Sequence, residues 1–119
     1  MMTITEERAI DFKKLKKIFS DNRNVMEQVM HGLIVTAHQK APDLERFYNA
    51  GRWKELKDCT NFIESAYQHV GTDLLKNTVQ NLSELVKKEE TSVELENEIS
   101  NLRTLSTVMI QDIEYYLAN

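Results

Sequence analysis

The chain contains few of the residues that make turns, cross-links or membrane segments. Among its 119 residues are only 3 Gly, 1 Pro and 1 Cys. A single cysteine excludes a disulfide framework within the chain, and so few turn-forming residues argue against a sandwich of many short strands. No stretch approaches the ~20 apolar residues that a membrane-spanning helix needs. The first seven residues lack a basic segment followed by an apolar run, so the expected location is the cytoplasm.

The charge pattern disfavours several classes of function. The net charge of -4 repels a phosphate backbone, so we expect neither a nucleic acid nor a membrane as partner. The basic run at residues 13–17 is predicted to be a solvated helix face, because the apolar residues around it are expected in the core: Phe12, Leu15, Ile18 and Phe19. The sequence contains no glycine-rich phosphate loop, no nucleophile with a neighbouring base and no clustered metal ligands. We therefore expect no enzyme activity, no cofactor and no metal.

Apolar residues recur at helical spacing along almost the whole chain, and they make up 41% of it. Pro42 is expected to end one helix and to begin a short one, which Gly51 then ends in a left-handed conformation. Six helical segments are predicted, at about residues 5–19, 22–39, 43–49, 53–71, 74–86 and 95–117. Residues 87–92 are expected to be a polar connection. The pattern indicates an all-α fold, a four-helix bundle with additional short N-terminal and connecting helices, in a single domain of residues 1–119.

The segment from Thr60 to Gly71 is the most informative part of the sequence. It reads Thr-Asn-Phe-Ile-Glu-Ser-Ala-Tyr-Gln-His-Val-Gly. It resembles the motif of histidine-containing phosphotransfer domains, roughly Ala-His-x-Leu-Lys-Gly-Ser-x-x-x-Leu-Gly, in which the phosphorylated histidine stands ten residues before the last glycine. Asn61 occupies that position here. The order of parts is also similar to the family: Pro-Asp-Leu before a short helix, Ala-Gly-x-Trp, the motif helix and a long last helix.

Helical geometry predicts that Asn61 points toward solvent. When Asn61 is set to zero and each residue adds about 100°, five apolar residues fall between about 140° and 220°: Leu56, Cys59, Ile63, Ala66 and Val70. Asp58 and six further polar residues fall within about 60° of Asn61. Asn61 and those six form the predicted docking face: Lys54, Lys57, Asn61, Glu64, Ser65, Gln68 and Thr72. Cys59 belongs to the buried stripe, where a thiol has a raised pKa and low reactivity.

The substitutions within the motif change its chemistry. A neutral imidazole nitrogen is a good nucleophile, whereas the amide nitrogen of Asn61 has its lone pair delocalised into the carbonyl group. Glu64 stands where the family has a lysine that holds the phosphoryl charge, and Ser65 stands where it has a glycine. The resemblance therefore implies an antiparallel bundle in two-component signalling that docks on a response-regulator receiver domain or a hybrid histidine kinase. Such a protein would compete for that partner without carrying phosphate.

Two alternatives remain open at this stage. His69 lies about 12 Å from Asn61 along the helix and about 80° around it, so it is the one histidine placed to serve as a displaced phosphate acceptor. Alternatively, the chain is a purely structural helical interaction domain, and Asn61 is ordinary surface. The expected state is a monomer, although a bundle with exposed polar faces is also compatible with a dimer.

Overall fold

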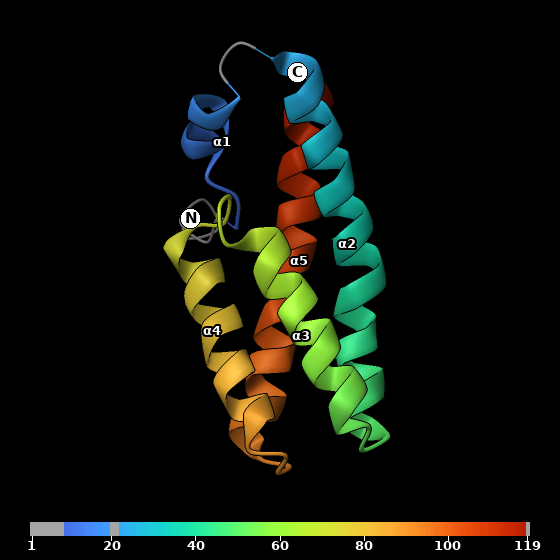
Figure 1. Cartoon of the computed structure of the whole chain (residues 1–119). Coiled ribbons are helices and arrows are strands. Elements are labelled where there is room, and N and C mark those ends of the chain that lie inside the picture. The colour runs from blue at the N-terminus through green and yellow to red at the C-terminus, as the bar shows by residue number, and fades with distance from the viewer. Residues whose placement is uncertain (1–8, 20–21, 119) are drawn as a thin grey trace, which may run out of the picture.

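The computed structural model describes residues 9–19 and 22–118, and the regular elements in these ranges are helices (Figure 1). This confirms the predicted all-α fold. Figure 1 shows that α2 to α5 lie along the long direction of the molecule and that each reverses the direction of the one before. The short α1 lies at one end. The helices of the described residues are α1 (Phe12–Ile18), α2 (Arg23–Asn49), α3 (Trp53–Tyr67), α4 (Asp73–Lys87) and α5 (Val93–Ala118).

The core lies between the four long helices. The packing is cyclic, because α2 contacts α3 and α5, and α4 contacts the same two helices. Each apolar stripe turns inward, since burying apolar surface is the main favourable contribution to folding. The stripe predicted for the last helix is confirmed over most of its length, and its buried members are Leu95, Ile99, Leu102, Leu105, Met109 and Ile113.

Proline 42 does not interrupt a helix, and the prediction that it would do so is wrong. The segments predicted at about residues 22–39 and 43–49 are one continuous helix, α2, with Pro42 inside it. Pro42 is exposed, whereas Ala41 and Leu44 beside it are buried. The proline removes one backbone donor, but its fixed φ is helical and the carbonyl that loses its partner can bind water. The burial of Ala41 and Leu44 therefore stabilises the continuous helix by more than the proline destabilises it.

The first helix begins later than predicted. The predicted start at Thr5 lies outside the described residues, and Ile10 forms an antiparallel bridge with Gly71 instead of a helical turn. α1 begins after Asp11, whose Oδ1 accepts a hydrogen bond from the Lys14 backbone N–H at 3.0 Å. The Asp11 N–H donates to the Val70 carbonyl oxygen at 2.9 Å. The N-terminal segment is thereby attached to the α3–α4 connection.

Only some of the apolar side chains of α1 are buried in the core. Leu15 is fully buried, and the ring of Phe12 stacks on Tyr116 of α5 with centroids 5.0 Å apart. Ile18, which was predicted to be in the core, is 50% exposed, so that prediction is wrong. At about 100° per residue the apolar residues of this segment span about 120°, with Leu15 in the middle and Ile18 at one edge, so the core covers Leu15 and leaves Ile18 half-exposed.

Left-handed backbone occurs in two of the connections that the structure describes. Gly51, between α2 and α3, has φ +67, which confirms the predicted left-handed ending, although the helix that it follows is the long α2. Glu89, after α4, has φ 52 and lies in the predicted polar connection. The Ser92 hydroxyl then accepts a hydrogen bond from the Leu95 N–H at 3.0 Å and caps α5. Among the described residues, no helix is long and apolar enough to cross a membrane.

Candidate functional site

Helix α3 carries most of the motif and lies between α2 and α4. At its start, the ring of Trp53 meets the ring of Tyr48 edge to face, with centroids 6.2 Å apart. At its end, the Gln68 N–H donates to the Glu64 carbonyl oxygen at 3.1 Å. Asn61 is therefore well inside the helix, with a full turn on each side.

The buried side of α3 is broader than predicted. Leu56, Cys59 and Ile63 are buried as expected, and Ala66 is half-buried. Thr60 and Tyr67 are also buried, at 1% and 2% exposed, although neither belongs to the predicted stripe. The Thr60 hydroxyl donates to the Leu56 carbonyl oxygen at 2.8 Å, so its burial leaves no polar group unpaired. Because α3 packs against both α2 and α4, residues on either side of its predicted apolar stripe are buried as well.

The opposite side of α3 is exposed, as predicted for Asn61. Exposed residues of the docking face on this helix are Lys54, Asn61, Ser65 and Gln68. Lys57 and Glu64 are only partly exposed. The ammonium group of Lys57 forms an ion pair with Glu89, which follows α4, and so Lys57 is engaged within the chain. The geometry agrees with the predicted orientation of α3, while the docking role of these residues stays a prediction.

Thr72 does not lie on α3, and its placement beside Asn61 is wrong. The angular count assumed that the helix continues to Gly71, but α3 ends at Tyr67. The Gly71 N–H returns to the Tyr67 carbonyl oxygen at 2.9 Å, and the chain turns there. Thr72 is the N-cap of α4 instead: its hydroxyl accepts from the Leu75 N–H at 3.4 Å. The docking face therefore ends at Gln68, the C-cap of α3.

His69 also lies beyond the end of α3, so its predicted position along the helix is wrong. It is exposed, and its Nε2 is 3.3 Å from the Gln68 Nε2. No described carboxylate forms an ion pair with its ring. The helical geometry that relates Asn61 to the rest of α3 therefore does not extend to His69.

Phe62, next to Asn61, is a surface residue that the sequence reasoning missed. It is 51% exposed, and the Nζ of Lys40 on α2 is 4.8 Å from its ring centroid. Helical geometry places Phe62 about 100° from Asn61, outside both the predicted polar face and the predicted apolar stripe. This position at the edge of the stripe was the sign in the sequence that Phe62 is not fully buried. Phe62 is therefore an aromatic residue at the border of the polar face, on the side nearest α2.

Cys59 is a protected thiol. It is 5% exposed, and its Sγ donates to the Lys40 carbonyl oxygen at 3.5 Å. Burial, with a smaller contribution from the negative charge of Asp43, raises its pKa to about 11. A thiolate is the reactive form of cysteine, so Cys59 is unreactive near neutral pH.

Ionisation of Cys59 should weaken the fold at high pH. Its pKa is near 9.0 without the protein environment and about 11 in the fold, so the unfolded chain loses the proton first. The free energy of unfolding should therefore fall as pH rises from about 9 to about 11, whereas below this window the contribution is complete. Urea unfolding at about pH 8 and about pH 10 measures the fall. Cys59→Ala should show a smaller fall, and an equal fall in both chains would contradict the assignment.

A small cleft lies beside the docking face. It has a volume of about 250 Å³ and is lined from α3 by Glu64, Tyr67 and Gln68 and from α4 by Lys76, Val79 and Gln80. Within residues 9–19 and 22–118, no three His, Cys, Asp or Glu residues are grouped so that they could hold a metal ion. The chemistry available at this site is therefore hydrogen bonding, charge and aromatic contact.

Comparisons with protein-family models, curated proteins and solved structures find no match to this chain. The resemblance to phosphotransfer domains consequently stays a prediction that rests on the motif. What the structure adds is the orientation of α3 and the neighbours of Asn61.

Proposed function

We propose that the chain is a pseudo-phosphotransfer protein, which docks on a receiver domain or a hybrid histidine kinase without carrying phosphate. The proposed architecture is an antiparallel four-helix bundle of α2 to α5, with α1 as an added short helix. The cyclic packing of these four helices and their alternating directions support this architecture. A bundle of this kind presents residues from the middle of a helix to a partner without rearrangement.

The exposed position of Asn61 in the middle of α3 is the observation that supports the proposal most. Its neighbours on the exposed side are polar, so a partner could approach without a cleft having to open. An amide can donate and accept hydrogen bonds to that partner, but it cannot take up a phosphoryl group. Glu64, one turn later, adds a negative charge where phosphoryl transfer would need a positive one.

Phe62 supplies a source of affinity that does not depend on phosphate. Aromatic side chains often dominate binding energy, because they bury a large area at a small cost in conformational entropy. The ring is half-exposed beside Asn61, and the Lys40 ammonium group lies over it. A partner that covers Asn61 would also cover this ring.

Binding to the receiver domains of the source organism tests the proposal. We expect Phe62→Asp to raise the dissociation constant by about thirtyfold, because the variant removes an aromatic anchor and buries a charge. Tyr115→Asp is the matched control, since Tyr115 is an aromatic residue on α5 that is 73% exposed. Isothermal calorimetry measures both. Failure of every receiver domain and kinase to bind the unmodified chain would overturn the proposed function.

The double variant Asn61→His, Glu64→Lys tests the position of the partner. It should accept a phosphoryl group from a phosphorylated receiver: the imidazole nitrogen forms the P–N bond as the P–O bond to the receiver's aspartate breaks. Acid-labile label on the double variant and none on the unmodified chain is the expected result. A variant that binds but is never labelled would contradict the docking geometry. Label on the unmodified chain that disappears in His69→Ala would show a carrier instead.

A further inference from the structure

One end of the molecule is strongly basic. The exposed lysines of α1 are Lys13, Lys16 and Lys17, and Arg23 at the start of α2 is exposed as well. Arg23 is paired with Glu27 at 2.9 Å, but among residues 9–19 and 22–118 the three lysines have no ion-pair partner. We call Lys13, Lys16 and Lys17 the basic patch. The Nζ of Lys16 lies over the ring of Tyr116, 5.5 Å from its centroid, a contact that leaves the positive charge of the patch without a described counter-ion.

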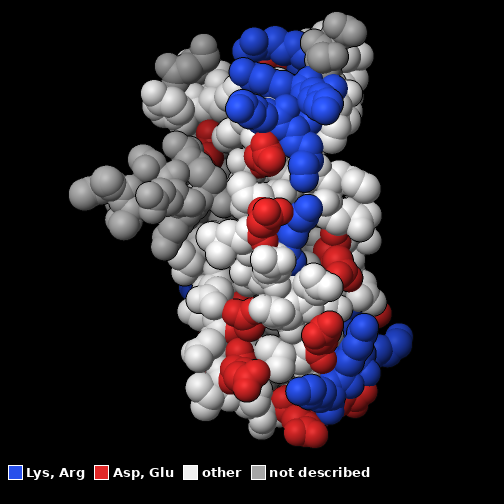
Figure 2. Space-filling model, turned by 90° about the vertical axis from the view of Figure 1, so that its left-hand side faces the viewer, with Lys and Arg blue, Asp and Glu red and all other residues white. Residues whose placement is uncertain are grey.

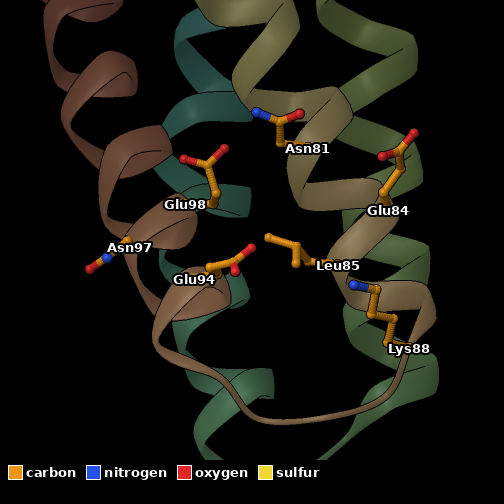
Figure 3. Close-up of a pocket in the computed structure, with 7 residues that line it drawn as sticks. All are labelled: Asn81, Glu84, Leu85, Lys88, Glu94, Asn97 and Glu98. Carbon is orange, nitrogen blue, oxygen red and sulfur yellow. The ribbon is translucent and has the colours of Figure 1, made fainter.

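An acidic cleft lies between α4 and α5 near their connection (Figure 3). It has a volume of about 500 Å³, and three of its lining residues are the glutamates Glu84, Glu94 and Glu98. In Figure 3, Glu94 and Glu98 extend from α5 toward α4, and Leu85 lies between the two helices. The remaining lining residues are Asn81, Asn97 and Lys88. No described lysine or arginine forms an ion pair with the three glutamates, and because Lys88 is the one cation of the lining, negative charge remains in excess in the cleft.

The basic and acidic features lie at opposite ends of one side of the molecule. Figure 1 shows α1 and α4 on the same side, with the α4–α5 connection at the end away from α1. Figure 2 looks onto this side: Lys and Arg gather at the α1 end, Asp and Glu are spread from just below them to the bottom, and a further basic group lies beside the lowest acidic residues. The longest dimension is 44 Å, far beyond the ~8 Å range of charge interactions at physiological salt. The two features therefore do not neutralise each other.

We propose that this side is the interface of a closed symmetric dimer, in which the basic patch of each copy lies against the acidic cleft of the other. A twofold axis through the middle of the side exchanges its two ends, so every contact is made twice. A nucleic acid or an anionic membrane spread over this side would be repelled by its acidic half. A second copy turned end for end sets its basic patch against the acidic cleft and its acidic cleft against the basic patch.

Exposed apolar residues at both ends strengthen the match. Ile18 on α1 is 50% exposed, and Val93 at the start of α5 is 72% exposed. Single surface ion pairs contribute little to binding, so buried apolar area and several simultaneous pairs are both needed. Because the proposed dimer is symmetric, its apolar contacts and its ion pairs each occur twice. It uses no residue of the docking face around Asn61, and it does not depend on the proposed function.

Charge reversal tests the dimer. Sedimentation of the unmodified chain should give the mass of two chains at about 0.05 M salt, and its dissociation constant should rise at least tenfold by about 0.5 M. One variant combines Lys13→Glu, Lys16→Glu and Lys17→Glu; a second combines Glu84→Lys, Glu94→Lys and Glu98→Lys. Each alone should be monomeric, with a dissociation constant raised about a hundredfold or more. Mixed in equal amounts, the two should form a one-to-one dimer, because both interface halves are then complementary again.

The same design contains its controls. The variant with all six substitutions keeps the net charge of -4 and should dimerise like the unmodified chain. Reversal of three exposed cations outside the patch and outside the docking face changes the net charge as much as the lysine variant does and should leave the dimer intact: Arg46→Glu, Arg52→Glu and Arg103→Glu. Circular dichroism verifies the fold of each variant.

Three results would overturn the dimer. One is a monomer at low salt, and another is an assembly larger than two chains. The third is a monomer that binds phosphatidylserine vesicles only while Lys13, Lys16 and Lys17 are intact, which would assign the basic patch to a membrane.

Discussion

Replacing Ile63 with alanine should lower the free energy of unfolding by about 2–5 kcal/mol, the usual cost of truncating a fully buried aliphatic residue. Ile63 is 1% exposed and lies on the core side of α3. Asn61→Ala, two residues away, should change the same quantity by no more than about 0.5 kcal/mol, because Asn61 is exposed and its side chain forms no ion pair or hydrogen bond with the described residues. The contrast is a direct test of the orientation of α3.

Urea unfolding followed by circular dichroism measures both variants. The dependence of the unfolding free energy on denaturant concentration should stay the same, because neither substitution changes the area exposed on unfolding by much. Similar losses in the two variants would mean that α3 is rotated about its axis. In that case Asn61 would be partly buried, and the proposed docking face would be wrong.

Replacing Pro42 with alanine should stabilise the protein by about 1–3 kcal/mol. Proline inside a helix costs about 3 kcal/mol relative to alanine, and part of that difference is offset because proline also restricts the unfolded chain. Pro42 is exposed inside α2, so alanine adds a backbone donor without disturbing the core. The donor can then pair with the carbonyl oxygen of His38, one turn earlier.

Thermal and urea unfolding of Pro42→Ala measure the gain. Pro42→Gly is the control, since glycine restores the same N–H but is a poor helix former, and its gain should be about 1 kcal/mol smaller. A loss of stability in Pro42→Ala would contradict a continuous α2. It would favour the break at Pro42 that the sequence pattern predicts.

The parts of the fold that were predictable depend on local periodicity. The apolar spacing from Leu95 to Ile113 predicts a buried stripe without knowledge of what covers it, and the stripe is buried. The exposed side of α3 was predictable for the same reason, because the angle between Asn61 and Ile63 depends only on helix geometry. Such predictions hold as long as the helix itself continues.

The errors arose where interactions distant in the sequence decide the outcome. Pro42 has a strong local preference against a helix interior, but packing of Ala41 and Leu44 overrides it. The end of α3 at Tyr67 depends on the turn at Gly71, which is held by the N-terminal segment. Thr72 was misplaced because that pairing is invisible in the local pattern. The exposure of Phe62 likewise depends on how closely α2 approaches α3.

The attachment of the N-terminal segment to the α3–α4 connection has a consequence for the order of folding. Thr72 donates through its backbone N–H to the Ala9 carbonyl oxygen at 2.9 Å, across 63 residues of sequence. Closing so long a loop is entropically costly and yields few contacts at once, whereas each pair of successive long helices closes a much shorter loop. The four long helices can therefore assemble first. We therefore expect the N-terminal segment to dock last, onto the turn at which the motif ends.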